Sequence, residues 1–390
     1  QMKKQNGITL IALVISIIVM LILAGISINA VVGDNGLLTK AQEAKLTSEE
    51  ALRRENLELL IFDYNTSKFL NKRDGLNKYL ENLVEIGEIE SFAATTDGDY
   101  SIIKYKGKIY EVVRQSEDSE YYKVIAEVTE DLGDIDGNYI LTQKTLNTVD
   151  NFKFEDKKSY IIKDEKLTGD DFEFNIPANS EVTIKVLYDM VIDNKGFKRS
   201  AIDLGDGATL NLYVYGKVEV NSGYGEEGET NTGTMAKGGP GGYAGIHVPE
   251  SATLNLYGTG MLISIGGDAG DGGSAISSDA GGAGGGGAGA GIGGHGGAGG
   301  NSNLYTGIWG DKVFTQSGAD GKSGENCGTI NIYNTLEVYA YGGAGASGGK
   351  YVTESGSSGT GGGGYPAAGI GGGLTPPCTF EQFLSCLWQV

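Results

Sequence analysis

The chain has 390 residues, of which 66 are glycine, and it carries a formal net charge of −20. Glycine is present at more than twice its usual share of about 7%. It does not recur with the strict Gly-X-Y period of collagen, so the chain is not a collagen. The acidic balance argues against nucleic acid and against an anionic membrane surface as partners.

The N-terminus joins a short basic leader, residues 1–7, to a long uncharged stretch. Lys3 and Lys4 lie in the leader, and residues 8–32 contain no charged side chain. As a helix, that stretch would be about 37 Å long, enough to cross a hydrocarbon core of about 30 Å. The sequence therefore predicts a transmembrane helix within residues 8–36, and the positive-inside rule places residues 33–390 outside the cell.

The segment Gly7-Ile8-Thr9-Leu10-Ile11 resembles the cleavage site of type IV prepilins. The resemblance implies cleavage between Gly7 and Ile8, a pilin-like helix, and pilin-like subunits as partners in a filament. That family usually has glutamate at the fifth mature position, where it neutralises the N-terminal amine of a neighbouring subunit in the filament. This chain has Ala12 there and lacks that charge, which argues against filament assembly. An uncleaved single-span anchor is the alternative.

Residues 37–135 have the pattern of a helical stem followed by a small α+β domain. Two alternating runs flank Lys106-Gly107, which predicts a β-hairpin over residues 100–113. Four apolar residues recur at helical spacing and predict a helix that packs on a sheet: Leu57, Leu60, Ile61 and Tyr64.

Residues 136–373 are organised around a repeated phrase. Ala-Thr-Leu-Asn-Leu-Tyr occurs at 208–213 and again at 252–257, and Gly-Thr-Ile-Asn-Ile-Tyr occurs at 328–333. Apolar residues alternate with polar ones, as in strands that have one buried face. Ile202 and Ile246 each lie eight residues before the first leucine of a copy. Repeats with equal offsets predict a parallel β-helix with its aliphatic side chains inside.

Residues 266–300 are rich in glycine and separate the second copy from the third. Such a segment is either disordered, as glycine-rich linkers are, or ordered by backbone hydrogen bonds between polyproline II strands; we favour disorder or loose ordering. The predicted fold class is mainly β, with an N-terminal transmembrane or pilin-like helix, a small α+β domain and a glycine-rich parallel β-helix.

The phrases Ala-Gly-Ile-Gly-Gly at 290–294 and 368–372, and Gly-Thr-Ile-Asn-Ile at 328–332, identify a second resemblance. They are similar to those of the glycine-rich, β-helical surface proteins of Firmicutes called carbohydrate-binding-domain proteins. The resemblance covers roughly 180–373. It implies a cell-surface protein with an extracellular polysaccharide as partner.

The outward face of the predicted coil repeats Thr-x-Asn-x-Tyr. Phenol rings can stack on sugar faces and amides can bond sugar hydroxyls, which favours a polysaccharide ligand. The alternative is that such ladders only stabilise the strands. The candidate ligand face consists of Thr209, Asn211, Tyr213, Thr253, Asn255, Tyr257, Thr329, Asn331 and Tyr333.

Catalysis finds little support in the sequence. His247 and His295 are 48 residues apart, and neither has an acid or a nucleophile at a recognisable spacing. The acidic stretch 164–171 and the segment 266–271 lack the regular spacing of calcium loops, so calcium is only a weak alternative to solvated loops. We therefore expect no enzyme and no cofactor. A β-helical polysaccharide-degrading enzyme is the third hypothesis.

The tail, residues 374–390, breaks with the repeat pattern and carries no predicted function. Cys378 and Cys386 could pair in an oxidising compartment, whereas Cys327 stands alone. The first functional hypothesis is an exported, pilin-like surface protein whose coil mediates adhesion or binds carbohydrate. The alternative is a structural surface spacer or fibre subunit without a ligand.

Overall fold

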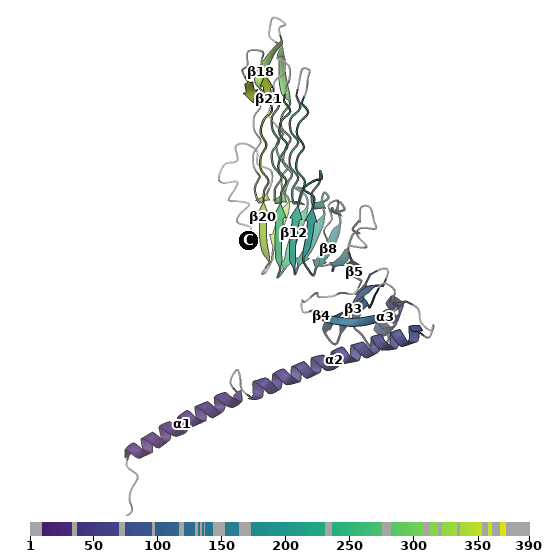
Figure 1. Cartoon of the computed structure of the whole chain (residues 1–390), viewed down its shortest axis with the longest axis vertical. Coiled ribbons are helices and arrows are strands. Elements are labelled where there is room, and N and C mark those ends of the chain that lie inside the picture. Colours follow the sequence, from purple (N-terminus) through teal and green to yellow (C-terminus); the bar gives the residue numbers. More distant parts are fainter. Residues whose placement is uncertain are drawn as a thin grey trace, which may run out of the picture. The chain divides into compact units, whose positions relative to one another are not determined.

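The computed structural model divides into two compact units, Gln1–Ser91 with Ile102–Val128, and Phe92–Ser101 with Thr129–Val390 (Figure 1). Several sequence features lie outside the described residues: the leader 1–7 with the site Gly7-Ile8, the acidic stretch 164–171, and the tail 374–390 with Cys378 and Cys386. The structure describes residues 10–32, 37–69, 75–95, 98–116, 121–128, 132, 135, 137–142, 153–163, 173–230, 236–274, 282–306, 312–318, 322–333, 336–352, 358–360 and 367–371.

The helices of the first unit correct the predicted fold class. They are α1 (Leu10–Val32), α2 (Leu37–Phe69) and α3 (Leu76–Glu85). Among the described residues, none of these helices combines the length and apolar character needed to cross a membrane. The predicted transmembrane helix is therefore wrong, as is the single-pass membrane localisation with residues 33–390 extracellular.

The apolar stripe of α2 forms part of the core of the first unit. Leu57, Ile61 and Tyr64 are buried, and Leu60 is half-buried. The side chain of Asn65 ties the helix to β4 (Tyr122–Val128): its Nδ2 donates to the carbonyl of Tyr122 and its Oδ1 accepts from the same residue's N–H, both at 2.9 Å. The stripe packs in the first unit as the helical spacing predicts.

The hairpin predicted over residues 100–113 is present as β2 (Tyr100–Tyr105) and β3 (Lys108–Arg114). Lys106 and Gly107 between them have φ of 48° and 73°. Two consecutive residues with positive φ are what a type I′ hairpin turn requires. Beyond it, β3 pairs antiparallel with β4.

The second unit is a coil of parallel strands that visits three sheets in turn (Figure 1). Sheet A contains β8 (Glu181–Val186), β11 (Thr209–Val214), β14 (Thr253–Gly258) and β19 (Thr329–Ile332). Sheet B contains β7 (Phe174–Ile176), β10 (Ile202–Leu204), β13 (Ile246–His247), β16 (Ile292–Gly293) and β23 (Ile370–Gly371). Sheet C contains β9 (Met190–Asp193), β12 (Lys217–Asn221), β15 (Met261–Ile265) and β20 (Glu337–Tyr341).

One pass through sheets B, A and C makes a rung, and four rungs stack in register. Leu210 pairs with Leu254, and Leu254 with Ile330. Because strand side chains alternate, every second residue points inward, and the leucines of the second and third rungs are fully buried. Sheet A extends before β8 through β6 (Lys158–Ile162), β5 (Tyr139–Leu141) and β1 (Ser91–Ala94).

Glycine-rich segments leave the coil between sheets C and B after β12, β15 and β20, and between sheets B and A after β16. The preference for disorder was wrong for residues 266–274 and 282–300, which are held by backbone hydrogen bonds. Gly239 and Gly242 donate to the carbonyls of Gly284 and Gly287 at 3.0 and 2.9 Å. Bonds that recur every third residue match the three residues per turn of polyproline II. We call residues 223–230, 236–244, 266–274, 282–291, 294–300 and 342–349 the glycine bundle.

Close approach explains why these positions are glycine. A Cβ on Gly242 would lie 2.0 Å from the carbonyl oxygen of Gly267, and one on Gly289 would lie 2.0 Å from that of Tyr243. Two hairpins continue from the bundle at the end away from the coil (Figure 1). They are β17 (Ser302–Thr306) with β18 (Lys312–Gly318), and β21 (Lys350–Val352) with β22 (Ser358–Thr360).

Candidate functional site

The nine residues of the predicted ligand face lie together on the outer side of sheet A. The strand register pairs Thr209 with Thr253 and Thr253 with Thr329. The same register aligns Asn211, Asn255 and Asn331, and it pairs Tyr213 with Tyr257. Tyr333 follows β19, and its ring stacks on that of Tyr257. The repeated phrase thus brings all three ladders together.

The asparagines form a hydrogen-bonded ladder. Nδ2 of Asn255 donates to Oδ1 of Asn211, and Nδ2 of Asn331 donates to Oδ1 of Asn255, both at 2.8 Å. The first amide continues the ladder to Oε1 of Glu181 at 3.3 Å. Each amide bonds its own neighbours, so a sugar would have to compete with these bonds.

The tyrosines are stacked on one another. The ring centroids of Tyr213 and Tyr257 lie 4.6 Å apart with planes 16° apart, and those of Tyr257 and Tyr333 lie 4.6 Å apart at 5°. Both faces of the Tyr257 ring are therefore covered. Stacking on a sugar needs a free ring face, so the geometry of this ladder favours the structural interpretation.

Sequence reasoning missed two tyrosines on the outer side of sheet C. Tyr339 and Tyr341 lie two residues apart on β20, on the same face, and are 43% and 54% exposed. Their register partners on β15 are Ile263 and Ile265, both only half-buried. The alternation of residues 337–341 could have revealed this pair, because Val338 marks the inward positions.

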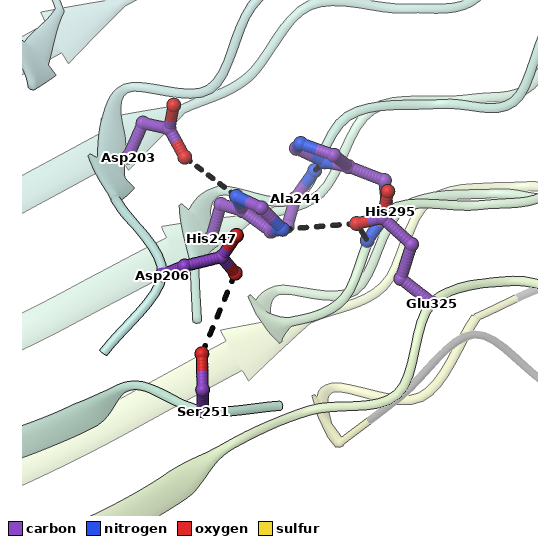
Figure 2. A network of polar contacts seen from close by, with 7 residues as sticks. All are labelled: Asp203, Asp206, Ala244, His247, Ser251, His295 and Glu325. Carbon is purple, nitrogen blue, oxygen red and sulfur yellow. Dashed lines mark hydrogen bonds and ion pairs between the residues drawn. The ribbon is translucent and has the colours of Figure 1, made fainter. Parts of the chain in front are cut away.

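A polar network lies on the outer side of sheet B (Figure 2). Asp203 on β10 and His247 on β13 are register partners, and His295 and Glu325 come from segments that follow β16 and precede β19. Nδ1 of His247 lies 2.5 Å from Oδ1 of Asp203, and its Nε2 lies 2.9 Å from Oε2 of Glu325. One imidazole thus bridges two carboxylates from different rungs.

The charges of the network are set by these contacts. Burial alone would lower the pKa of His247, but its hydrogen bonds with Asp203 and Glu325 outweigh burial and raise the pKa to about 9. The hydrogen bond from His247 lowers the pKa of Glu325 to about 2. Nearby, burial followed by the charge of Asp203 raises the pKa of Glu173 to about 7. His247 is therefore a cation at neutral pH.

His295 is the neutral partner of that cation. Its ring stacks on His247 with centroids 3.8 Å apart and planes 16° apart, and its Nδ1 accepts a hydrogen bond from the N–H of Ala244 at 3.0 Å. An accepting Nδ1 leaves the ring proton on Nε2. Burial, and then the positive charge of His247, lower the pKa of His295 to about 4.

Within the described part of the chain, Asp203, His247 and His295 form a group that could hold a metal ion, with one ligand atom each and these atoms within 4.8 Å of one another. Both nitrogens of His247 are bonded to carboxylates, however, and the lone pair of His295 at Nδ1 is taken by Ala244. Nearly parallel stacked rings also direct their in-plane lone pairs side by side and not at one point. This arrangement holds a proton, and a metal ion would have to displace several hydrogen bonds.

Part of this network could have been predicted from the sequence. Asp203 and His247 each follow the isoleucine that begins a rung, so the equal offsets of Ile202 and Ile246 place them side by side. His295 and Glu325 lie on the glycine-rich excursion and have no such marker. Comparisons of the chain with protein-family models, with curated proteins and with solved structures gave no match.

Proposed function

We propose that this chain is a non-catalytic scaffold in which the coil is a base for the glycine bundle, and the bundle holds the hairpins β17–β18 and β21–β22 at its far end. The observation that carries the proposal is the backbone hydrogen bonding at every third residue across the bundle. A free glycine-rich linker behaves as a flexible chain, whereas cross-bonded polyproline II segments form a stiff support.

The polar features of the coil support the same conclusion. The asparagine and tyrosine ladders of sheet A bond and stack on themselves. Neither nitrogen of His247 is available as a general base, because each is bonded to a carboxylate. These hydrogen bonds and stacked rings tie neighbouring rungs together.

Distances between spin labels test the scaffold. Labels are placed at Ser251→Cys on the coil and Lys350→Cys on β21, in a background with Cys327, Cys378 and Cys386 replaced by serine. We expect a narrow distance distribution, because the bundle fixes the hairpin relative to the coil. A distribution as broad as that of a flexible linker would contradict the proposal.

A second candidate function is binding of a neutral polysaccharide at Tyr339 and Tyr341. Their exposure, their position two residues apart on one strand face, and the adjacent Ile263 and Ile265 favour it. A panel of neutral and acidic polysaccharides tests it with the whole chain. Tyr339→Ala and Tyr341→Ala should abolish binding, while Tyr257→Ala should not. Binding by none of the panel, or loss only in Tyr257→Ala, would reject this site.

A further inference from the structure

The outer side of sheet C brings aliphatic side chains and exposed rings together beside carboxylates. The strand register aligns Glu219, Ile263 and Tyr339 in one row across β12, β15 and β20. Two residues further along the strands, Ile265 and Tyr341 belong to the next row. Because outward side chains recur at every second residue, both rows lie on one face. Exposed rings beside aliphatic side chains are suited to the apolar face of a sugar.

Glu337 lies beside these rows, two residues before Tyr339 on the same face of β20, and it is exposed. Oη of Tyr339 donates a hydrogen bond to Oε2 of Glu337 at 3.3 Å. The negative charge of Glu337, and then this hydrogen bond, raise the pKa of Tyr339. The carboxylate is therefore held next to a ring that a stacked sugar would contact.

Glu337 differs from the other carboxylates of this face in its position and its charge balance. Glu219 is two strands away from β20, and Nζ of Lys217 lies 3.5 Å from its Oε2. Asp193 is on β9, three strands away from β20. Within the described part of the chain, no lysine or arginine forms an ion pair with Glu337. The rings thus have one uncompensated negative charge directly beside them.

An ionised carboxylate beside a stacking ring affects neutral and acidic sugars differently. A carboxylate has about four acceptor positions, so Glu337 retains positions for sugar hydroxyls after its contact with Tyr339. A uronate or sulfate group at the same place would instead bring two like charges together. At a separation of about 5 Å in water, that repulsion weakens binding about 4-fold for each pair of charges.

We propose that Glu337 determines the specificity of the site formed by Tyr339 and Tyr341. Its carboxylate accepts hydrogen bonds from the hydroxyls of a neutral polysaccharide that stacks on the two rings. It repels polymers that carry carboxylate or sulfate groups. The inference rests on the second candidate function and extends it, because it assigns the selection against acidic polymers to one residue.

Polymers with the same backbone and different charge test this role. Binding of the full chain is measured for hydroxyethyl cellulose against carboxymethyl cellulose, and for dextran against carboxymethyl dextran. At low ionic strength, we expect the wild type to bind the carboxymethyl member of a pair at least about 4-fold more weakly. Glu337→Gln keeps an acceptor for Oη of Tyr339 and should remove most of this difference.

Two controls separate the charge of Glu337 from other effects. Glu227→Gln removes one charge from an exposed residue of the glycine bundle and should leave the difference unchanged. At 1 M salt the Debye length is about 3 Å, so the wild-type difference should shrink, whereas a steric effect of the carboxymethyl group would persist. Circular dichroism checks that both variants fold.

The outcomes distinguish a failure of this inference from a failure of the site. Equal binding of both members of a pair by the wild type overturns the role of Glu337, as does discrimination that Glu337→Gln leaves unchanged. Either result leaves the second candidate function standing. Binding of none of the four polymers, or binding that Tyr341→Ala leaves intact, overturns the site itself and the inference with it.

Discussion

His247 and His295 differ in charge although their rings are in contact. The difference arises because the carboxylates of Asp203 and Glu325 bond one ring, while a backbone N–H fixes the accepting nitrogen of the other. The protonated side chain of His247 thus joins three passes of the chain, its own and those of Asp203 and Glu325. The network therefore contributes to stability in a way that depends on pH.

The raised pKa of His247 sets the basic side of that dependence. A group whose pKa rises from 6.5 unfolded to about 9 folded stabilises the fold below pH 6.5 and loses this contribution as the pH rises to 9. We expect His247→Gln to cost about 3 kcal/mol near pH 6 and much less above pH 9. Urea unfolding at several pH values measures it, and a cost that is constant with pH would contradict the assignment.

His295 should show the opposite sign. Its pKa falls from 6.5 to about 4 in the folded chain, so the wild type loses stability as the pH falls from 6.5 to 4. His295→Gln keeps an acceptor for the N–H of Ala244 but does not titrate, so it should reduce this loss. The stabilising contribution of Glu325 is also lost between pH 4.5 and 2, and Glu173 titrates at about pH 7. The stability of the variant is therefore compared with that of the wild type at each pH. An unchanged acid limb in the variant would contradict the assignment.

At the scale of the element, the glycine bundle depends on the absence of side chains. A Cβ at Gly242 meets a backbone carbonyl oxygen at 2.0 Å, whereas one at Gly196 meets nothing within 4 Å. We expect Gly242→Ala to destabilise the second unit by about 3 kcal/mol through overpacking, and Gly196→Ala to change stability by less than about 0.5 kcal/mol. Thermal unfolding compares the two, and equal effects would exclude the close packing described.

The elements also show what sequence could predict. The copies at 208–213, 252–257 and 328–333 carry their own alternation, so their register follows from matching identical positions. The ordered structure of residues 282–300 could not be predicted this way. It depends on backbone hydrogen bonds between distant segments, and glycine has no side chain whose pattern would indicate those bonds. Only one of the two partners of His247 could be predicted from the sequence: Asp203 shares its rung offset, while Glu325 lies in a segment without periodicity.

At the scale of the whole molecule, burial within the described coil falls from its middle rungs to its last rung. The column Leu212, Leu256 and Ile332 runs from full burial to 38% exposure. We expect Leu256→Ala to cost about 3 kcal/mol, because it leaves a cavity, and Ile332→Ala to cost about 1 kcal/mol or less. Denaturant unfolding under dilute conditions distinguishes them, and a cost for Ile332→Ala equal to that for Leu256→Ala would show that the end is covered within one chain.

The central claim is that glycine-rich segments without a hydrophobic core of their own form an ordered bundle on the coil. Amide hydrogen exchange measured by NMR tests it most directly at Gly239, Gly242, Gly286 and Gly289, whose N–H groups donate to carbonyls of neighbouring segments. We expect these four amides to exchange far more slowly than unstructured glycine, with protection recurring every third residue. Exchange of all four at the rate of a free glycine-rich chain would contradict the account.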